Sequence, residues 1–447
     1  MTARRDDRTR ALAPVAALGI TAFFCCVDAR HVTPTEPSPS PFVPFAPSAP
    51  TTDATGLSAP TANAGEPGTT TSAGLTAPPR LAAPPVARVR LVDATRRGPI
   101  RFSVDGRYRV IAGIHGPGAS RESALAAGED LPDVVCKPSA RGLRLNTAQF
   151  PARDLTIIPE AGATFSIGGR SYRGTLVLRT GKDGRVVAEN LLDLEQYVAG
   201  VLFAEMPKRF DDEALRSQAV AARTFALHRL QQGKTLRDDQ GSQVYAGLER
   251  ETKAGRRIVR STRGEVLTYS GALIPAYFHS TCGGHTSSAR DVFGMSAPPP
   301  LSHGVPCAGC RGTRWARWTR ALDERRVAAL YKGTFGDRLT PRSVVADNGG
   351  RPVVMEIIDR AGKPVDRPSA DRLRNDYNLG RSLAQSLPSA WFSLQRGPKG
   401  LVAAGRGFGH GVGLCQYGSD GLARAGHDYR KILATYYPGA DLTRRYD

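Results

Sequence analysis

Hydrophobic and polar residues alternate with a period of two over much of the region between residues 87 and 191. Such alternation is typical of strands that bury one face. It occurs at residues 87–92, 100–104, 155–159, 165–167, 172–178 and 186–191. The pairs Gly168-Gly169 and Asp183-Gly184 indicate turns, and Asp105-Gly106 indicates a hairpin. The N-terminal part of the folded region is therefore expected to be rich in β-structure.

The hydrophobic period changes to that of helices after residue 193. Residues 194–206 predict a helix that ends before Pro207, because proline disfavours the helical conformation at the residue preceding it. Asp211 or Asp212 can cap a second helix, which carries small apolar residues on one face. Further strands are expected at 258–259, 266–268, 274–278 and 353–358, and short helices at 323–331, 370–379, 419–425 and 429–436. The fold class is therefore α+β, with a β-rich N-terminal part, a central helix–Pro–helix segment, and mixed strands followed by a glycine-rich C-terminal segment.

The first 85 residues have a different composition from the rest. Four arginines precede an apolar stretch at residues 11–27, which predicts an export signal over residues 1–28. Cys25 or Cys26 can carry a lipid anchor, and cleavage by a standard signal peptidase is the alternative. Residues 29–85 are rich in Pro, Ser, Thr, Ala and Gly and predict a disordered linker. We therefore expect an exported protein of the cell envelope, in the periplasm or on the outer face of the cytoplasmic membrane, with a folded domain at 86–447.

The net charge of the 447-residue chain is +20. A charge of this size attracts polyanions such as nucleic acids, anionic membranes and anionic wall polymers. No nucleic-acid-binding motif occurs, and the basic residues are scattered along the chain, so no nucleic-acid partner is expected. A solvated, arginine-rich surface is the simpler interpretation, and a polyanion-binding surface is the alternative.

One acidic residue interrupts an otherwise apolar run at the end of the first predicted helix. Glu205 follows Val-Leu-Phe-Ala at 201–204 and precedes Met206-Pro207. Apolar surroundings disfavour the anion, so the pKa of this carboxyl should be raised, and a carboxyl that is protonated near neutral pH can act as a general acid. An ordinary acidic residue that points to water at a helix end is the alternative.

Five motifs occur in one order along the region from residue 86 to the C-terminus. They read NLLDLEQYVAGVLFAEMP, EALRSQAVAARTFAL, FHSTCGGHT, GRGFGHGVGLCQYG and ILATYYPGA. In this combination the chain resembles the stage II sporulation protein D family, also called SpoIID/LytB. The resemblance implies action on peptidoglycan as a lytic transglycosylase, which cuts between N-acetylmuramic acid and N-acetylglucosamine, prefers strands without peptide stems and leaves a 1,6-anhydro end. Other members are described as amidase enhancers, so a non-catalytic wall-binding protein with an amidase partner is the alternative.

The resemblance also implies that Glu205, in the Glu-Met-Pro motif, is the catalytic residue. Most glycosidases need two carboxyls. A lytic transglycosylase can use one carboxyl twice, because the C6 hydroxyl of the sugar attacks in place of water. No cofactor is required for this chemistry.

Four cysteines in the matched region suggest a metal site. Cys307 and Cys310 form a C-x-x-C pair, a recurrent zinc-binding element. With Cys282, and with Cys415 or His285 as the fourth ligand, they predict a structural zinc site, which the family permits without requiring. Two disulfides are the alternative, since export favours them. A catalytic zinc amidase is disfavoured because no H-E-x-x-H arrangement occurs.

Substrate-binding candidates lie in the same motifs. His410 is flanked by glycines that indicate close approach of a ligand, so it can hydrogen-bond a sugar or orient Glu205. The other candidates are Gln218, Arg223, Ser280 and Gln416. Arg223 lies on an alanine-rich helix, and pairing with a carboxylate is its alternative role.

Overall fold

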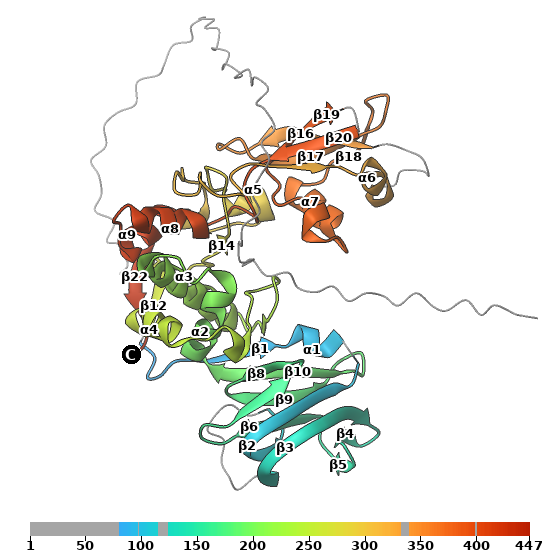
Figure 1. Cartoon of the computed structure of the whole chain (residues 1–447), viewed down its shortest axis with the longest axis vertical. Helices are drawn as coiled ribbons and strands as arrows, with labels where there is room; N and C mark the ends of the chain where they lie inside the picture. Colours follow the sequence, from blue (N-terminus) through green and yellow to red (C-terminus); the bar gives the residue numbers. More distant parts are fainter. Residues whose placement is uncertain (1–79, 97, 115–123, 332–338, 398–399) are drawn as a thin grey trace, which may run out of the picture.

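A computed structural model of the chain describes residues 80–96, 98–114, 124–331, 339–397 and 400–447 (Figure 1). The predicted signal, almost all of the predicted linker, and Cys25 and Cys26 lie outside these residues. None of the described helices is both long and apolar enough to cross a membrane.

The N-terminal part forms one large sheet, at the bottom of Figure 1. Buried and more exposed side chains alternate at 86–90, 100–105 and 164–167, as the period-two pattern predicts, whereas the strands at 154–159, 175–180 and 186–193 are buried on both faces over most of their length. The described strands of this sheet pair antiparallel except for one parallel pair, between residues 86–90 and 236–237. In spatial order the sheet contains β11 (Leu236–Arg237), β1 (Val86–Arg90), β10 (Val186–Asp193), β9 (Thr175–Thr180), β6 (Asp154–Pro159), β2 (Ile100–Ala112), β3 (Ala124–Ser139), β4 (Gly142–Leu145) and β5 (Ala148–Phe150). In addition, β7 (Thr164–Ile167) pairs with β2, and β8 (Arg170–Tyr172) pairs with β7. The predicted α+β class is confirmed.

The hairpin expected at Asp105-Gly106 was wrong. Strand β2 continues through both residues, and an irregularity in its register with β3 occurs between Val104 and Arg107. Gly106 has φ +94°, and its N–H donates to Asp130 Oδ1 at 2.7 Å. Pairing with β3, β6 and β7 keeps the strand extended, so the glycine forms a bulge and not a turn.

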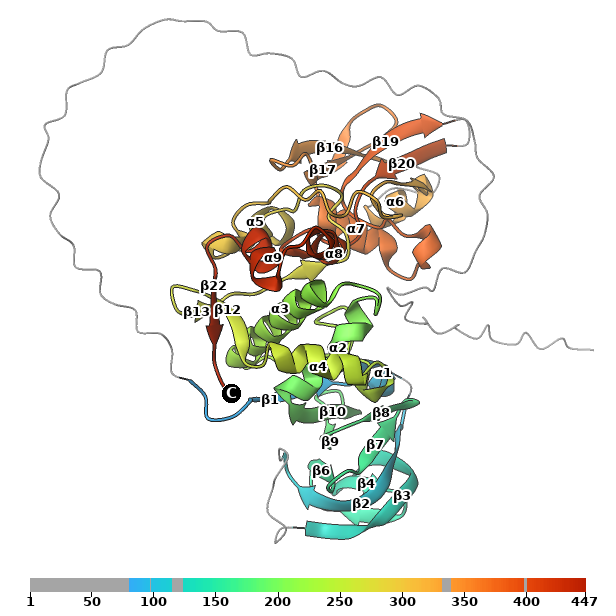
Figure 2. The same ribbon diagram turned by 60° about the vertical axis from the view of Figure 1, so that its left-hand side comes forward.

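Three helices lie above the sheet, α2 (Leu194–Glu205), α3 (Asp212–Gln231) and α4 (Lys253–Ser261), as Figures 1 and 2 both show. Asp193 caps α2 by accepting from the Glu195 and Gln196 N–H groups, and Asp211 caps α3 by accepting from the Glu213 N–H. The strand expected at 258–259 was wrong, because Ile258 and Val259 form the buried side of α4. Two adjacent apolar residues fit a strand and a helix equally well.

The C-terminal segment returns to this helical layer. Helices α8 (Gln416–Arg424) and α9 (Tyr429–Tyr436) pack against α3. Strand β14 (Phe278–His279) pairs parallel with β21 (Leu414–Cys415), and β12 (Glu265–Tyr269) pairs with β13 (Ala272–Leu273) and β22 (Asp441–Arg444). Segments more than 130 residues apart in sequence therefore meet beside α3.

Residues 318–403 contribute a second hydrophobic cluster, separate from the one that the sheet and α2, α3, α4, α8 and α9 share. It forms the lobe at the top of Figures 1 and 2. Its elements are β15 (Trp318–Ala321), α6 (Glu324–Leu330), β16 (Thr340–Ala346), β17 (Pro352–Ile358), β18 (Pro364–Asp366), α7 (Ala370–Asn378), β19 (Phe392–Gly397) and β20 (Gly400–Gly405). The region expected to be one domain thus contains two cores, the second inserted between Cys310 and His410.

Candidate active site

Glu205 is the last residue of α2. The helix stops there because Met206 has the extended conformation that a following proline favours. The side chain is half-buried, and its Oε1 accepts a hydrogen bond from the Val244 N–H at 2.6 Å. Burial raises the pKa of the carboxyl to about 7, although hydrogen bonds from Val244 and from the Gln416 side chain act in the opposite direction. The carboxyl can therefore hold a proton near neutral pH and lose it again.

The loop that carries the Val244 N–H is held against α2 by the residues on either side of Val244. Gln243 accepts a hydrogen bond from the Tyr197 hydroxyl at 2.9 Å, and the Tyr245 ring packs on Tyr197 with a centroid separation of 5.2 Å. Gly200 makes this approach feasible, since a Cβ there would lie 2.6 Å from the Tyr245 ring. No sequence signal identifies Val244 as a partner of Glu205, because Val244 contributes a backbone N–H, which every residue except proline has.

Gln416 lies beside Glu205, and Gln218 lies next to Gln416. Gln416 is the first residue of α8, immediately after the short strand β21, and its amide donates to Gln218 Oε1 on α3 at 3.5 Å. Ser280 follows the parallel partner strand β14, and its carbonyl accepts from the Tyr417 N–H at 3.1 Å. The predicted residues Gln218, Ser280 and Gln416 are thus brought together at one end of the β14–β21 pair, near the catalytic candidate.

His410 has a different environment from the one expected. Its Nε2 donates to the Phe278 carbonyl at 2.9 Å, and its Nδ1 accepts from the Val412 N–H at 3.1 Å. Burial lowers the pKa of the imidazole to about 3, so the ring is neutral. Both ring nitrogens are engaged by backbone groups, and the structure places no contact between this ring and Glu205. His410 therefore holds the glycine-rich segment against β14.

Arg223 lies in the core and not on a surface that a glycan can reach. Its guanidinium is fully buried and pairs with both carboxylate oxygens of Glu195, at 2.7 and 2.8 Å. The same carboxylate accepts from the Tyr446 hydroxyl at 2.7 Å. The structure therefore contains the alternative role predicted for Arg223, which is pairing with a carboxylate. Through this pair Arg223 joins α2, α3 and the C-terminal segment.

The four cysteines form one buried group. The sulfurs of Cys282, Cys307, Cys310 and Cys415 all lie within 4.8 Å of one another, and Cys282 Sγ and Cys310 Sγ are 3.5 Å apart. Four thiolates around zinc, each about 2.3 Å from the metal, would have sulfurs ~3.8 Å apart. His285 is outside this group, and its Nδ1 lies 2.7 Å from the Thr286 carbonyl oxygen.

Three of the four sulfurs accept a hydrogen bond from a backbone N–H, and the fourth contacts a hydroxyl. Cys282 Sγ accepts from the Gly284 N–H at 3.4 Å, Cys415 Sγ accepts from the Gly418 N–H at 3.3 Å, and Cys310 accepts from the Gly283 N–H. The Tyr436 hydroxyl lies 3.1 Å from Cys307 Sγ. Donors directed at sulfur stabilise thiolates, the form in which cysteine binds metal. The donor set therefore fits a closed site for four-coordinate zinc.

The chain matches known proteins over most of its described length. A family model described as stage II sporulation protein matches residues 182–269, which contain Glu205. An uncharacterized protein of Brachyspira hyodysenteriae is 31% identical over 371 residues, covering 80% of this chain and 92% of that protein. The stage II sporulation protein D of Bacillus subtilis is 31% identical over 277 residues, covering 56% of this chain and 75% of that protein. The amidase enhancer of Bacillus subtilis is 27% identical over 344 residues, or 67% of this chain and 48% of that protein.

The proteins that this chain resembles thus include both sporulation proteins and an amidase enhancer. The chain belongs to the stage II sporulation protein D family.

Proposed function

We propose that this protein is a lytic transglycosylase that cleaves the glycan strands of peptidoglycan, with Glu205 as its acid and then its base. The observation that carries the proposal is the environment of this carboxyl. It is desolvated enough for its pKa to reach about 7, and its side chain is still partly exposed. The two groups that donate to it, the Val244 N–H and the Gln416 amide, fix its orientation.

The reaction needs one proton carrier. Protonated Glu205 gives its proton to the glycosidic oxygen as the bond from that oxygen to C1 of the muramic acid residue breaks. The resulting carboxylate takes the proton of the C6 hydroxyl as the C6 oxygen bonds to C1 of the same sugar. The products are a free 4-hydroxyl on the leaving strand and a 1,6-anhydro end, and Glu205 is protonated again. The groups that donate hydrogen bonds to Glu205 are amides, so they leave the carboxyl free to carry the proton.

Digestion of peptide-free glycan strands tests this function. Mass spectrometry of the soluble products should show fragments that end in anhydro-muramic acid, which are 18 Da lighter than the hydrolysed equivalents. Fragments with reducing ends only would indicate a hydrolase and would contradict the proposal.

A second candidate function rests on the similarity to the amidase enhancer of Bacillus subtilis. In that case the protein binds peptidoglycan and increases the activity of an amidase partner without cleaving glycan. The two functions differ in their dependence on Glu205. Stimulation of an amidase that is unchanged in Glu205→Gln, together with no anhydro product from the wild type, would favour the enhancer.

We further propose that Cys282, Cys307, Cys310 and Cys415 hold a structural zinc ion. The separation of the sulfurs and the three N–H groups directed at them support zinc over two disulfides. Zinc in a site closed by four thiolates supplies cross-linking between chain segments and takes no part in glycan cleavage. We also propose that the protein is exported and acts in the cell envelope. This location agrees with either function.

A further inference from the structure

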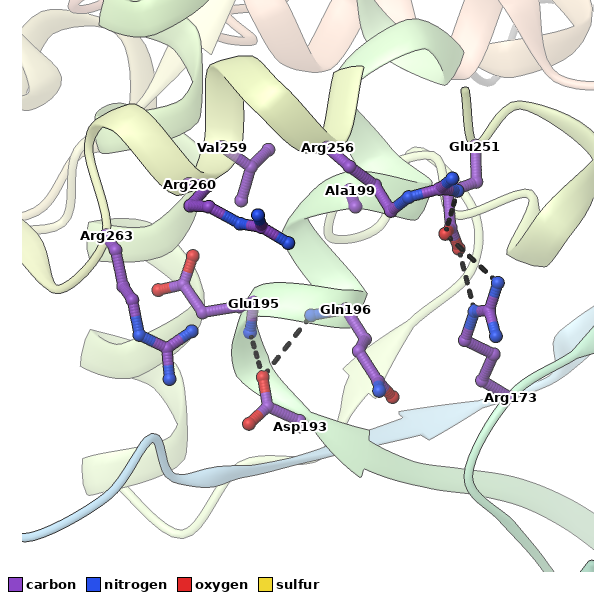
Figure 3. A pocket seen from close by; sticks show the side chains of 10 residues that line it. All are labelled: Arg173, Asp193, Glu195, Gln196, Ala199, Glu251, Arg256, Val259, Arg260 and Arg263. Carbon is purple, nitrogen blue, oxygen red and sulfur yellow. Dashed lines mark hydrogen bonds and ion pairs between the residues drawn. The ribbon is translucent and has the colours of Figure 1, made fainter. Parts of the chain in front are cut away.

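A cavity lies at the other end of α2 from Glu205. It has a volume of about 460 Å³ and lies between the start of α2 and helix α4 (Figure 3). Gln196, which lines it, is nine residues from Glu205 on the same helix. At 100° and 1.5 Å per residue, the two side chains leave opposite sides of the helix and are ~13 Å apart along its axis. The cavity is therefore separate from the proposed catalytic site.

The cavity has an excess of positive charge. Four arginines and three carboxylates line it, and one of these carboxylates, Glu195, is already neutralised by Arg223 in the core. Glu251 lies between Arg173 and Arg256 and pairs with both. The remaining acid, Asp193, accepts hydrogen bonds from the N–H groups of Glu195 and Gln196 in the first turn of α2.

Two arginines are left without a partner within the described part of the chain. Arg260, at the end of α4, and Arg263, just after it, extend toward the start of α2 in Figure 3. Neither guanidinium forms an ion pair or a hydrogen bond with another described residue, although Asp193 and Glu251 line the same cavity. Two free guanidinium forks that converge on one cavity are suited to bidentate binding of carboxylate or phosphate.

The floor of the cavity is apolar. Ala199, one turn after Glu195 on α2, and Val259 on α4 are both buried and both line it. A ligand that fits this cavity therefore combines anionic groups with small apolar groups. A phosphodiester polymer offers charge alone, and its regularly spaced anions would also meet the Asp193 and Glu251 carboxylates.

We propose that this cavity binds a carboxylate-bearing stem peptide of peptidoglycan, with Arg260 and Arg263 on its carboxylates and with alanine methyl groups on Ala199 and Val259. The proposal rests on the proposed function, because it takes peptidoglycan as the substrate. Since the cavity is on the side of α2 opposite Glu205, the bound stem belongs to a neighbouring strand and not to the strand being cut. The site would bind the protein to peptidoglycan strands that still carry stem peptides, while a neighbouring strand without stem peptides is cleaved.

Binding of a free stem tetrapeptide to the purified protein, by calorimetry at about 0.15 M salt, tests the proposal. Saturable binding is expected, and the double variant Arg260→Ala/Arg263→Ala should bind at least about tenfold more weakly, since hydrogen bonds to charged groups are strong. The double variant Arg257→Ala/Arg290→Ala is the matched control, because it removes the same charge from exposed residues outside the cavity. Its affinity should stay within about twofold of the wild type.

Three further probes identify the ligand. The same tetrapeptide with amidated carboxyls should lose the binding, and a glycerol phosphate oligomer and inorganic phosphate should bind more weakly than the free peptide. Tighter binding of the oligomer would assign the cavity to a phosphodiester polymer and overturn the proposal, and so would equal binding by the amidated peptide or by the Arg260/Arg263 variant.

The outcome is independent of catalysis. Glu205→Gln should bind the peptide as the wild type does, and the Arg260/Arg263 variant should cleave peptide-free strands at the wild-type rate. Absence of anhydro product with intact peptide binding would contradict the proposed activity alone.

Discussion

At the scale of single residues, two opposing effects set the proton affinity of Glu205. Loss of water around the carboxyl raises its pKa, whereas the Val244 N–H and the Gln416 amide stabilise the anion and lower it. Desolvation is the larger effect, and the pKa settles at about 7. A general acid that must also act as a base works best with a pKa close to the ambient pH, because neither proton transfer is then strongly uphill.

The first prediction concerns the pH dependence of cleavage. The free protein must carry protonated Glu205, and a raised pKa means that this form is abundant below pH 7 and is lost as the pH rises above it. We expect kcat/KM on peptide-free strands to decrease about tenfold per pH unit above pH 7. A profile that is flat from pH 6 to pH 9 would show that no proton of this pKa is needed.

The second prediction concerns Gln416 as a positioning residue. Gln416→Ala removes a donor that stabilises the Glu205 carboxylate, so the pKa of Glu205 should rise further. We expect the descending limb of the pH profile to move up by about one pH unit. Ser280→Ala, in which the Ser280 carbonyl still accepts from Tyr417, is the control. A fall in rate with no movement of the limb would indicate a structural role only.

At the scale of secondary-structure elements, the Glu195–Arg223 pair joins the start of α2 to the middle of α3. Arg223 also donates to the Val259 and Glu265 carbonyls, so one guanidinium links α2, α3, α4 and β12. These elements place the end of α2, and hence Glu205, relative to the rest of the layer.

The third prediction follows from the burial of that pair. Arg223→Met leaves the Glu195 carboxylate buried without its cation and should lower the free energy of unfolding by about 3–5 kcal/mol. The double variant Glu195→Leu/Arg223→Met should recover a large part of this loss, because it leaves no unpaired charge. Denaturant unfolding of the three proteins measures both effects, and equal stability of wild type and Arg223→Met would contradict the structural role.

Local sequence signals predicted some elements and missed others for identifiable reasons. Helices α2 and α3 were predicted correctly, since proline, aspartate and a helical period all agree there, and of the two predicted caps, Asp211 and Asp212, the structure has Asp211. The bulge at Gly106 and the helix around Val259 depend on tertiary partners, which short sequence windows do not contain.

At the scale of the whole molecule, the cysteine group joins segments on either side of the inserted lobe. Cys282, Cys307 and Cys310 precede residues 318–403, and Cys415 follows them. A metal at this point would fix both ends of the insertion and hold Gln416, the neighbour of Cys415, next to Glu205.

The fourth prediction is that the purified protein contains one zinc ion per chain and four metal-protected thiols at these positions. Removal of the metal with a chelator under reducing conditions should lower Tm by about 5–10 °C or more, because metal binding free energy contributes to folding. Added zinc should restore Tm. Absence of metal together with oxidised cysteines would establish the disulfide alternative.

The site was predictable from sequence only in part. The run around Glu205 indicated an unusual carboxyl, and burial does raise its pKa. The hydrogen bonds from Val244 and Gln416, which oppose this rise, come from distant segments that the local sequence does not reveal. His410 and Arg223 are polar residues in conspicuous motifs, and the structure gives them partners inside the protein. Nothing in the sequence distinguishes Arg260 and Arg263 from the many other arginines, because only the fold shows that both line one cavity.

The most direct test of the account compares wild type and Glu205→Gln on peptide-free glycan strands, with anhydro-muramyl products measured by mass spectrometry. The amide keeps the size of the side chain and its acceptor for the Val244 N–H, so the fold and glycan binding should be unchanged. It cannot give and retake a proton, so we expect product formation to fall by at least about a thousandfold. Anhydro product released by Glu205→Gln at a rate close to that of the wild type would contradict the assignment of Glu205 as the catalytic acid and base.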